Sequence, residues 1–224
     1  MEYTDFIIKL KLSFFEASKS MFAYIHGLNS DGERSRKNLT ECLGQKVFNL
    51  TWECDRPFDE NIAYLIAQCE NIEEENPVDI SLFESPVWER FVMIGSSMGG
   101  YYAAVLSAIK DYPCALFNSV VYPKRTLQKF KGTNTNFATG IKYEMTQEII
   151  DSYNFCGNLK KPLIDRAIVL GRNDEVLDYK EAEAFFREAA EILITDCNHQ
   201  IKDYSPFKKL IADLQYRAVF FNDD

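Results

Sequence analysis

One serine in the sequence stands in a pattern that can make it a nucleophile. Residues 95–99 read GSSMG, which is the G-x-S-x-G spacing with Ser97 at its centre. An apolar run precedes this segment and an Ala-rich, predicted helical segment follows it. A sharp strand-to-helix turn exposes the hydroxyl to a base, and glycines on both sides relieve the crowding. Ser96 lacks the flanking glycines, so we predict a structural role for it.

An acid and a base follow at the ends of two later predicted strands. Asp174 comes shortly after the apolar run 167–171, and His199 comes shortly after the run 192–195. The carboxyl ends of parallel strands meet at one edge of a sheet, where ligands bind. The chain order Ser97, Asp174, His199 is that of the α/β-hydrolases. These residue types perform acyl transfer: the histidine takes the serine proton and the carboxylate orients the imidazole.

The acid and the base each have rivals. Three other carboxylates lie nearby: Glu175, Asp178 and Asp196. Asp174 is favoured because a short turn after the strand can present it inward. The other histidine of the chain is His26, for which we predict a hydrogen-bonded structural role.

A loop early in the chain supplies the remaining part of such a site. The apolar run 21–27 ends in His26-Gly27, and His-Gly motifs occur where α/β-hydrolases form the oxyanion hole. Backbone N–H groups are well suited to hold developing negative charge, because they are fixed in place. We predict that the N–H groups of Leu28 and Met98 form this hole.

Alternating apolar runs and amphipathic segments predict an α/β fold, a mostly parallel central sheet with helices on both faces. Strands are predicted at 21–27, 46–50, 91–96, 114–119, 167–171 and 192–195, and helices at 35–43, 58–72, 98–110, 179–190 and 206–216. Residues 1–224 are interpreted as one α/β-hydrolase domain. Residues 1–20 form an extension predicted as a strand, and residues 124–161 form a lid insertion with a polar loop at 132–136 and a helix near 146–153.

Composition narrows the function classes. The 224 residues are 46% hydrophobic and 26% charged, as in a globular domain. The net charge of -9 argues against nucleic acid or an anionic membrane as a general partner. The six cysteines contain no C-x-x-C pair and there are two histidines, so we expect reduced thiols in a cytoplasmic protein without a zinc site. No apolar run reaches the roughly 18 residues of a membrane span.

Four segments resemble those of the YqiA/YcfP-type small bacterial esterases. They are 24–30 (YIHGLNS), 95–103 (GSSMGGYYA), 174–179 (DEVLDY) and 198–199 (NH), and the resemblance extends from about residue 21 to the C-terminus. It implies a compact α/β-hydrolase that hydrolyses carboxylic esters with Ser97, Asp174 and His199, without metal or cofactor. Two positions depart from the family pattern: Asn173 replaces a glycine, and Asp196-Cys197 replaces Gly-Gly.

Three readings of the activity follow. We expect an esterase for short to medium acyl chains, because a lid of fewer than 40 residues encloses limited volume. The alternatives are an acyl thioesterase with the same residues, and a catalytically silent binding protein with the same fold. The substrate is a small acyl ester or thioester, and the oligomeric state is left open.

Overall fold

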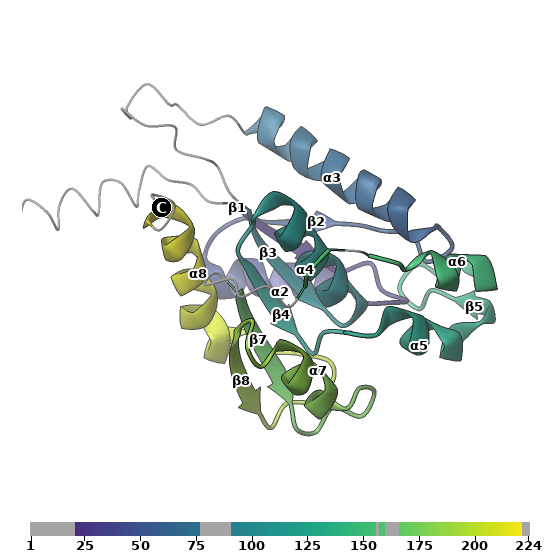
Figure 1. Cartoon of the computed structure of the whole chain (residues 1–224). Helices are drawn as coiled ribbons and strands as arrows, with labels where there is room; N and C mark the ends of the chain where they lie inside the picture. Colours follow the sequence, from purple (N-terminus) through teal and green to yellow (C-terminus); the bar gives the residue numbers. More distant parts are fainter. Residues whose placement is uncertain (1–20, 77–90, 156, 160–165, 221–224) are drawn as a thin grey trace, which may run out of the picture.

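The computed structural model describes residues 21–76, 91–155, 157–159 and 166–220. Within them lies a six-stranded parallel sheet of order β2-β1-β3-β4-β7-β8 (Figure 1). Its strands are β1 (Met21–Ile25), β2 (Val47–Leu50), β3 (Phe91–Ser96), β4 (Cys114–Phe117), β7 (Arg166–Gly171) and β8 (Glu191–Thr195). All six predicted core strands are confirmed. The strand predicted in residues 1–20 lies outside the described residues.

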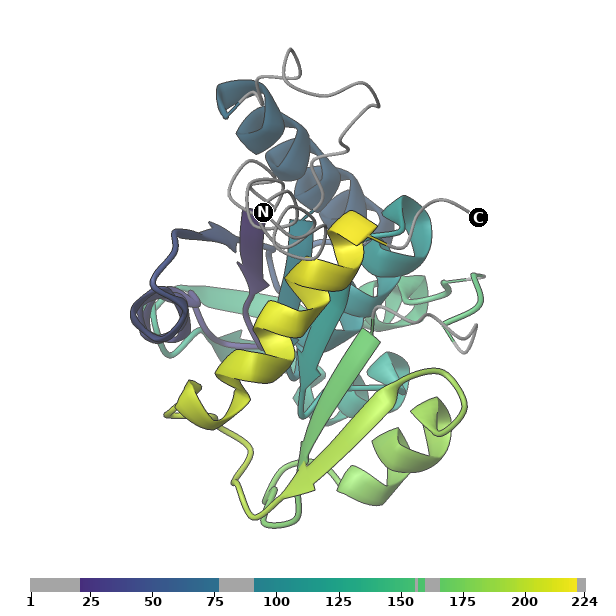
Figure 2. The ribbon, with the colours of Figure 1, turned by 90° about the vertical axis from the view of Figure 1, so that its left-hand side faces the viewer.

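Helices cover both faces of this sheet. One face carries α2 (Glu33–Leu43) and α8 (Lys208–Phe220), which follows the short helix η3 (Ser205–Phe207), as Figure 2 shows. The other carries α3 (Phe58–Glu75), α4 (Met98–Lys110) and α7 (Tyr179–Phe186). The predicted helix at 179–190 therefore ends earlier than expected. None of the described helices is both long and apolar enough to cross a membrane.

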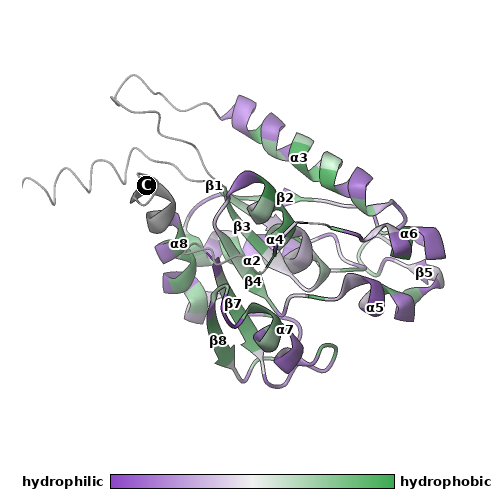
Figure 3. Ribbon diagram, viewed as in Figure 1, coloured by the Kyte–Doolittle hydropathy of each residue, from purple (hydrophilic) through white to green (hydrophobic). Residues whose placement is uncertain are grey.

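Strands β1, β3, β4 and β7 are buried on both faces, and their side chains alternate between two cores, whereas the edge strand β8 is partly exposed. In β1, Phe22 and Tyr24 pack towards α2 and α8, whereas Ala23 and Ile25 pack towards α3 and α4. Because successive side chains of a strand point to opposite faces, continuous apolar runs are expected when both faces are covered. Figure 3 shows this pattern, with hydrophobic strands inside and hydrophilic residues on the outer helical surfaces.

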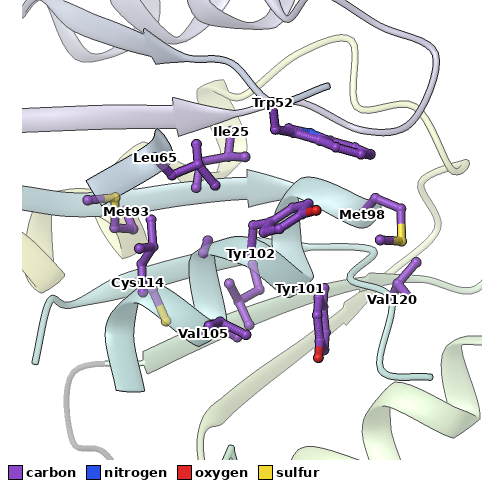
Figure 4. Packing of buried hydrophobic residues seen from close by; sticks show 14 of the residues in the cluster. Ile25, Trp52, Leu65, Met93, Met98, Tyr101, Tyr102, Val105, Cys114 and Val120 are labelled. Atoms are coloured by element: carbon purple, nitrogen blue, oxygen red, sulfur yellow. The ribbon is translucent and has the colours of Figure 1, made fainter. Parts of the chain in front are cut away.

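An aromatic cluster fills the core beside the carboxyl end of β3 (Figure 4). The rings of Trp52 and Tyr102 are 4.9 Å apart, and Tyr101 and Met98 of α4 belong to the same core. The hydroxyls of Tyr102 and Tyr153 share a hydrogen bond of 2.7 Å. This bond ties α4 to the segment that ends the predicted lid.

The insertion between β4 and β7 has more regular structure than predicted. It contains α5 (Pro123–Leu127), η2 (Gln128–Phe130), β5 (Gly132–Thr135), β6 (Lys142–Met145) and α6 (Gln147–Ser152). The helix predicted near 146–153 is confirmed as α6, and the Thr146 hydroxyl caps it by accepting from the Ile149 N–H at 3.2 Å.

The prediction of a polar loop at 132–136 is wrong. β5 occupies most of this stretch and pairs antiparallel with β6, so that Gly132 lies opposite Met145 and Thr135 opposite Lys142. The Asn- and Thr-rich sequence of β5 has no apolar alternation to mark it as a strand. Its partner strand supplies the hydrogen bonds that the local sequence does not indicate.

Candidate active site

Ser97 lies in a strained turn between β3 and α4. Its backbone angles are φ 56° and ψ -121°, a region that residues other than glycine rarely adopt. The Ser97 N–H donates to the Phe117 carbonyl at 3.0 Å, and the Ser97 carbonyl accepts from the N–H groups of Gly100 and Val120, both at 3.1 Å. These bonds hold a conformation that costs on the order of 1–3 kcal/mol, and such strain is concentrated at functional sites.

The glycines that flank Ser97 are sterically required. A Cβ on Gly95 would lie 2.3 Å from the Gly99 carbonyl oxygen, and one on Gly99 would lie 2.1 Å from the Ile25 carbonyl oxygen. Both contacts are with backbone that cannot move aside. The N-terminus of α4 therefore packs directly onto the ends of β1 and β3, as the G-x-S-x-G spacing predicts.

Asp174 and His199 are in contact. His199 Nδ1 lies 2.9 Å from Asp174 Oδ2 and 3.0 Å from Oδ1. The Asp174 side chain is 2% exposed, and its Oδ1 also accepts from the N–H groups of Val176 (2.8 Å) and Leu177 (2.9 Å). Each partner comes from a loop after a different strand, β7 or β8, as the sequence predicts.

The pKa of Asp174 and the tautomer of His199 follow from these hydrogen bonds. Burial alone would raise the pKa of Asp174, but the hydrogen bonds from His199 and from the two backbone N–H groups outweigh burial and lower it. An ionised carboxylate can only accept hydrogen bonds, so the imidazole proton is assigned to Nδ1. The lone pair of His199 is then on Nε2, where it can take a proton.

The three rival carboxylates have other partners. Glu175 Oε2 accepts from the backbone N–H of His199 at 3.1 Å. Asp178 caps α7 by accepting from the Lys180 N–H at 3.0 Å, and Asp196 pairs with Arg172 at 2.9 Å on the surface. None of the three is bonded to the His199 ring in the described part of the chain.

His26 is a buried structural residue. Its ring is stacked on Trp52 at 5.6 Å, and its Nδ1–H donates to the Gly27 carbonyl at 2.8 Å. The residue is 2% exposed, and burial lowers the pKa of its imidazole. The Trp52 indole N–H donates to the His26 carbonyl at 2.9 Å, so these contacts fix the end of β1.

The loop after β1 lies against Ser97. A Cβ on Gly27 would be 3.2 Å from Ser97 Cβ and 3.7 Å from Ser97 Oγ. The next residue is Leu28, and Met98 is the first residue of α4. Neither the Leu28 nor the Met98 N–H donates to another of the described residues. An oxyanion hole requires backbone N–H groups that are free in this way.

The Ser97 turn and the His199 loop attach to neighbouring residues at the end of β4. Phe117 accepts from the Ser97 N–H, while the Asn118 side chain donates to the His199 carbonyl at 3.0 Å. Within the described ranges the Ser97 hydroxyl has no hydrogen bond to His199. The structure thus joins Asp174 to His199 directly, and joins the Ser97 turn to them through β4. Sequence reasoning missed this use of Asn118, which its place at a strand end could have signalled.

A narrow cleft reaches the Asp174 loop from the insertion side. It runs between α5 and α7 and is lined by Val120, Tyr122 and Leu177 among others. An ion pair between Arg125 of α5 and Glu181 of α7 links its two walls. The lining also includes Asn118, Thr126 and Asp178, so a ligand in this cleft would meet both apolar and polar side chains.

Residues 21–215 match the model of the Uncharacterised protein family (UPF0227). The chain belongs to this family. A UPF0227 protein of Enterobacter sp. (strain 638) is 22% identical over 191 residues, which cover 83% of this chain and 93% of that protein.

Solved structures similar to this UPF0227 member include esterases and a thioesterase. Est1E from Butyrivibrio proteoclasticus superposes with a TM-score of 0.60 at 13% identity, covering 89% of this chain and 86% of Est1E. The Pyrococcus furiosus esterase Pf2001 gives 0.56 at 17% identity, covering 88% and 81%. YbtT, a type II thioesterase of the yersiniabactin pathway, gives 0.54 at 12% identity, covering 89% and 94%. At these identities the likeness establishes the fold, and the chain has the α/β-hydrolase fold.

Proposed function

We propose that this UPF0227 protein is a serine hydrolase that cleaves carboxylic esters of short to medium acyl chains. The observation that carries the proposal is the contact of the buried Asp174 carboxyl with His199, in a fold where Ser97 occupies a strained turn at the same sheet edge. Each residue follows a different parallel strand, so the arrangement is a property of the fold and not of one local sequence.

The proposed reaction is a two-step acyl transfer. His199 Nε2 takes the Ser97 proton as Oγ attacks the ester carbonyl, and Asp174 stabilises the imidazolium. The N–H groups of Leu28 and Met98 hold the oxyanion. His199 then protonates the leaving alcohol, and a water molecule activated by the same histidine releases the acyl group from Ser97.

In this proposal the insertion between β4 and β7 acts as a lid over the site. Its hairpin β5–β6 is bonded to the loop that follows β1: Tyr143 donates to Asn29 Oδ1 at 2.6 Å, and Asn136 donates to the Ser30 carbonyl at 3.4 Å. This loop contains Leu28, the proposed oxyanion donor. The lid therefore borders the reacting carbonyl and limits the acyl chains that fit.

A thioester substrate is the second candidate, and the fold shared with the thioesterase YbtT favours including it. The same three residues would form the same acyl-enzyme, and only the leaving group would change from an alcohol to a thiol. A panel of p-nitrophenyl esters and acyl-CoA thioesters of increasing chain length separates the two activities.

The panel should be run with the wild type, Ser97→Ala and the matched control Ser96→Ala. Measured serine hydrolases lose about 10⁶-fold in turnover when the nucleophile is removed, and we expect a loss of this order for Ser97→Ala. Ser96→Ala should remain within a few-fold of wild type. Absence of hydrolysis by the pure wild type across the panel would overturn the proposal in favour of a binding protein.

A further inference from the structure

Asn118 lies at the end of β4, between the Ser97 turn and the loops of Asp174 and His199. It is 2% exposed and has a φ of 45°, in the left-handed region that asparagine tolerates better than most residues. Its backbone N–H donates to the Val169 carbonyl at 2.9 Å, which ties it to β7.

The Asn118 side chain binds both loops at once. Its Oδ1 accepts from the Gly171 N–H at 2.7 Å, and Gly171 in turn accepts from the Asp174 N–H at 3.2 Å. Its Nδ2 donates to the carbonyls of Asn198 (2.9 Å) and His199 (3.0 Å). Three backbone partners thus use the acceptor and both donors of one buried amide.

The neighbours of Asn118 hold the nucleophile turn. The Phe117 carbonyl accepts from Ser97 N–H at 3.0 Å, and the Val120 N–H donates to the Ser97 carbonyl at 3.1 Å. The residues from 117 to 120 therefore contact all three loops. A displacement of the His199 loop relative to this segment changes the distance from His199 Nε2 to Ser97 Oγ.

We propose that Asn118 is a positioning residue, whose amide sets the register between the His199 loop and the Ser97 turn. The proposal rests on the proposed function, since it assigns Asn118 a task in that reaction. The amide touches no reacting atom. Because the hydrogen bonds are directional and the loop carbonyls have no other described side-chain donor, the two Nδ2 bonds fix the height of the His199 backbone above the sheet.

Asn118→Asp tests this with almost no change of shape. The carboxylate still accepts from the Gly171 N–H but faces two carbonyl oxygens without a donor, so the His199 loop moves away. A misplacement of about 1 Å costs on the order of 10²-fold in rate, so we expect kcat to fall about 10²-fold with KM within about threefold. If this variant fails to fold, Asn118→Gly replaces it, because glycine accepts the positive φ.

Asn61→Asp is the matched control. Asn61 is also fully buried and also uses one acceptor and two donors on backbone groups: it accepts from the Glu53 N–H at 3.0 Å and donates to the carbonyls of Glu53 (2.8 Å) and Arg56 (3.1 Å). Its backbone partners lie after β2, so its loss should lower the melting temperature and leave kcat within threefold. Equal effects of Asn61→Asp and Asn118→Asp on kcat would overturn the proposal.

A second measurement does not depend on a substrate. The proton on His199 Nδ1 is hydrogen-bonded to the Asp174 carboxylate and should therefore give a downfield signal in the ¹H NMR spectrum. This signal is simple to assign because the chain has two histidines. Asn118→Asp should shift or abolish this signal, and Asn61→Asp should leave it in place. If the wild type hydrolyses no ester, the proposed function fails, and the signal still decides the role of Asn118: an unchanged signal in Asn118→Asp refutes it.

Discussion

Gly27→Ala should impair catalysis while leaving the fold nearly as stable as before. A Cβ at this position would lie 3.2 Å from Ser97 Cβ, 3.4 Å from the Ser96 carbonyl oxygen and 3.7 Å from Ser97 Oγ. These contacts are tight without being impossible, so the backbone must give by a few tenths of an ångström. The displacement falls on the loop that carries Leu28 and on the Ser97 turn.

The size of the effect follows from this geometry. Overpacking by one methyl costs about 1 kcal/mol at the low end of its range. Alanine also reduces the freedom of the unfolded chain, which contributes roughly 0.4–1 kcal/mol of stabilisation where the backbone angles allow it. The two nearly cancel. In catalysis, an oxyanion donor is worth about 10²–10³-fold, and partial misplacement of Leu28 should cost about 10- to 100-fold in kcat.

Gly44→Ala is the control, because it should lower stability and leave catalysis unchanged. Gly44 ends α2 with a φ of 71°, and a Cβ there would contact nothing within 4 Å. Alanine in this conformation costs about 1 kcal/mol, which lowers Tm by roughly 2–4 °C in a chain of this size. Measurements of kcat and Tm on both variants should separate activity from stability. Wild-type kcat in Gly27→Ala would refute the placement of the oxyanion site.

Three further outcomes are expected. In Asp174→Asn, the oxygen should stay on its two backbone N–H donors and turn the amide NH₂ towards His199 Nδ1, forcing the proton onto Nε2; kcat should fall by roughly 10⁴-fold with little loss of Tm, and a fall below tenfold would contradict this. Burial lowers the pKa of His26, so below a pH of about 6.5 the unfolded chain is protonated at this residue while the folded chain is not. The free energy of unfolding should therefore decrease with falling pH, by up to about 1.4 kcal/mol per pH unit. Urea titrations at pH 7, 6 and 5 should show that this free energy depends less on pH in His26→Gln. Glu175→Ala should lower kcat a few-fold and Glu175→Gln, which keeps an acceptor for the His199 N–H, should lower it less; equal losses would assign the effect to charge.

Local spacing predicts the parts of the molecule whose contacts are local. The glycines around Ser97 could be predicted because their crowding arises within one turn and with the strand beside it. The central strands could be predicted because burial on both faces makes their runs apolar throughout. Strand ends then indicated Asp174 and His199, since parallel strands bring their carboxyl ends together.

Parts that depend on distant partners could not be predicted. β5 carries Asn and Thr residues that form a strand only because β6 pairs with them. Asn118 gives no local sign that it binds Gly171 and His199, which follow 53 and 81 residues later.

The two departures from the family pattern meet in space. Asn173 Nδ2 donates to the Asp196 carbonyl at 2.7 Å, and the Asn173 N–H donates to the Cys197 carbonyl at 3.3 Å. The Asn173 side chain, which replaces a glycine in one loop, therefore binds the backbone of the other loop. The Asp174–His199 hydrogen bond is kept beside them.

The most direct test of the account is the identity of the residue that becomes acylated or phosphonylated. The wild type is incubated with a fluorophosphonate, and the adduct is counted by intact mass and located by peptide sequencing. The account predicts one adduct per chain, on Ser97, which is retained in Ser96→Ala and absent in Ser97→Ala. An adduct that persists in Ser97→Ala, or that maps to another residue in the wild type, would contradict it.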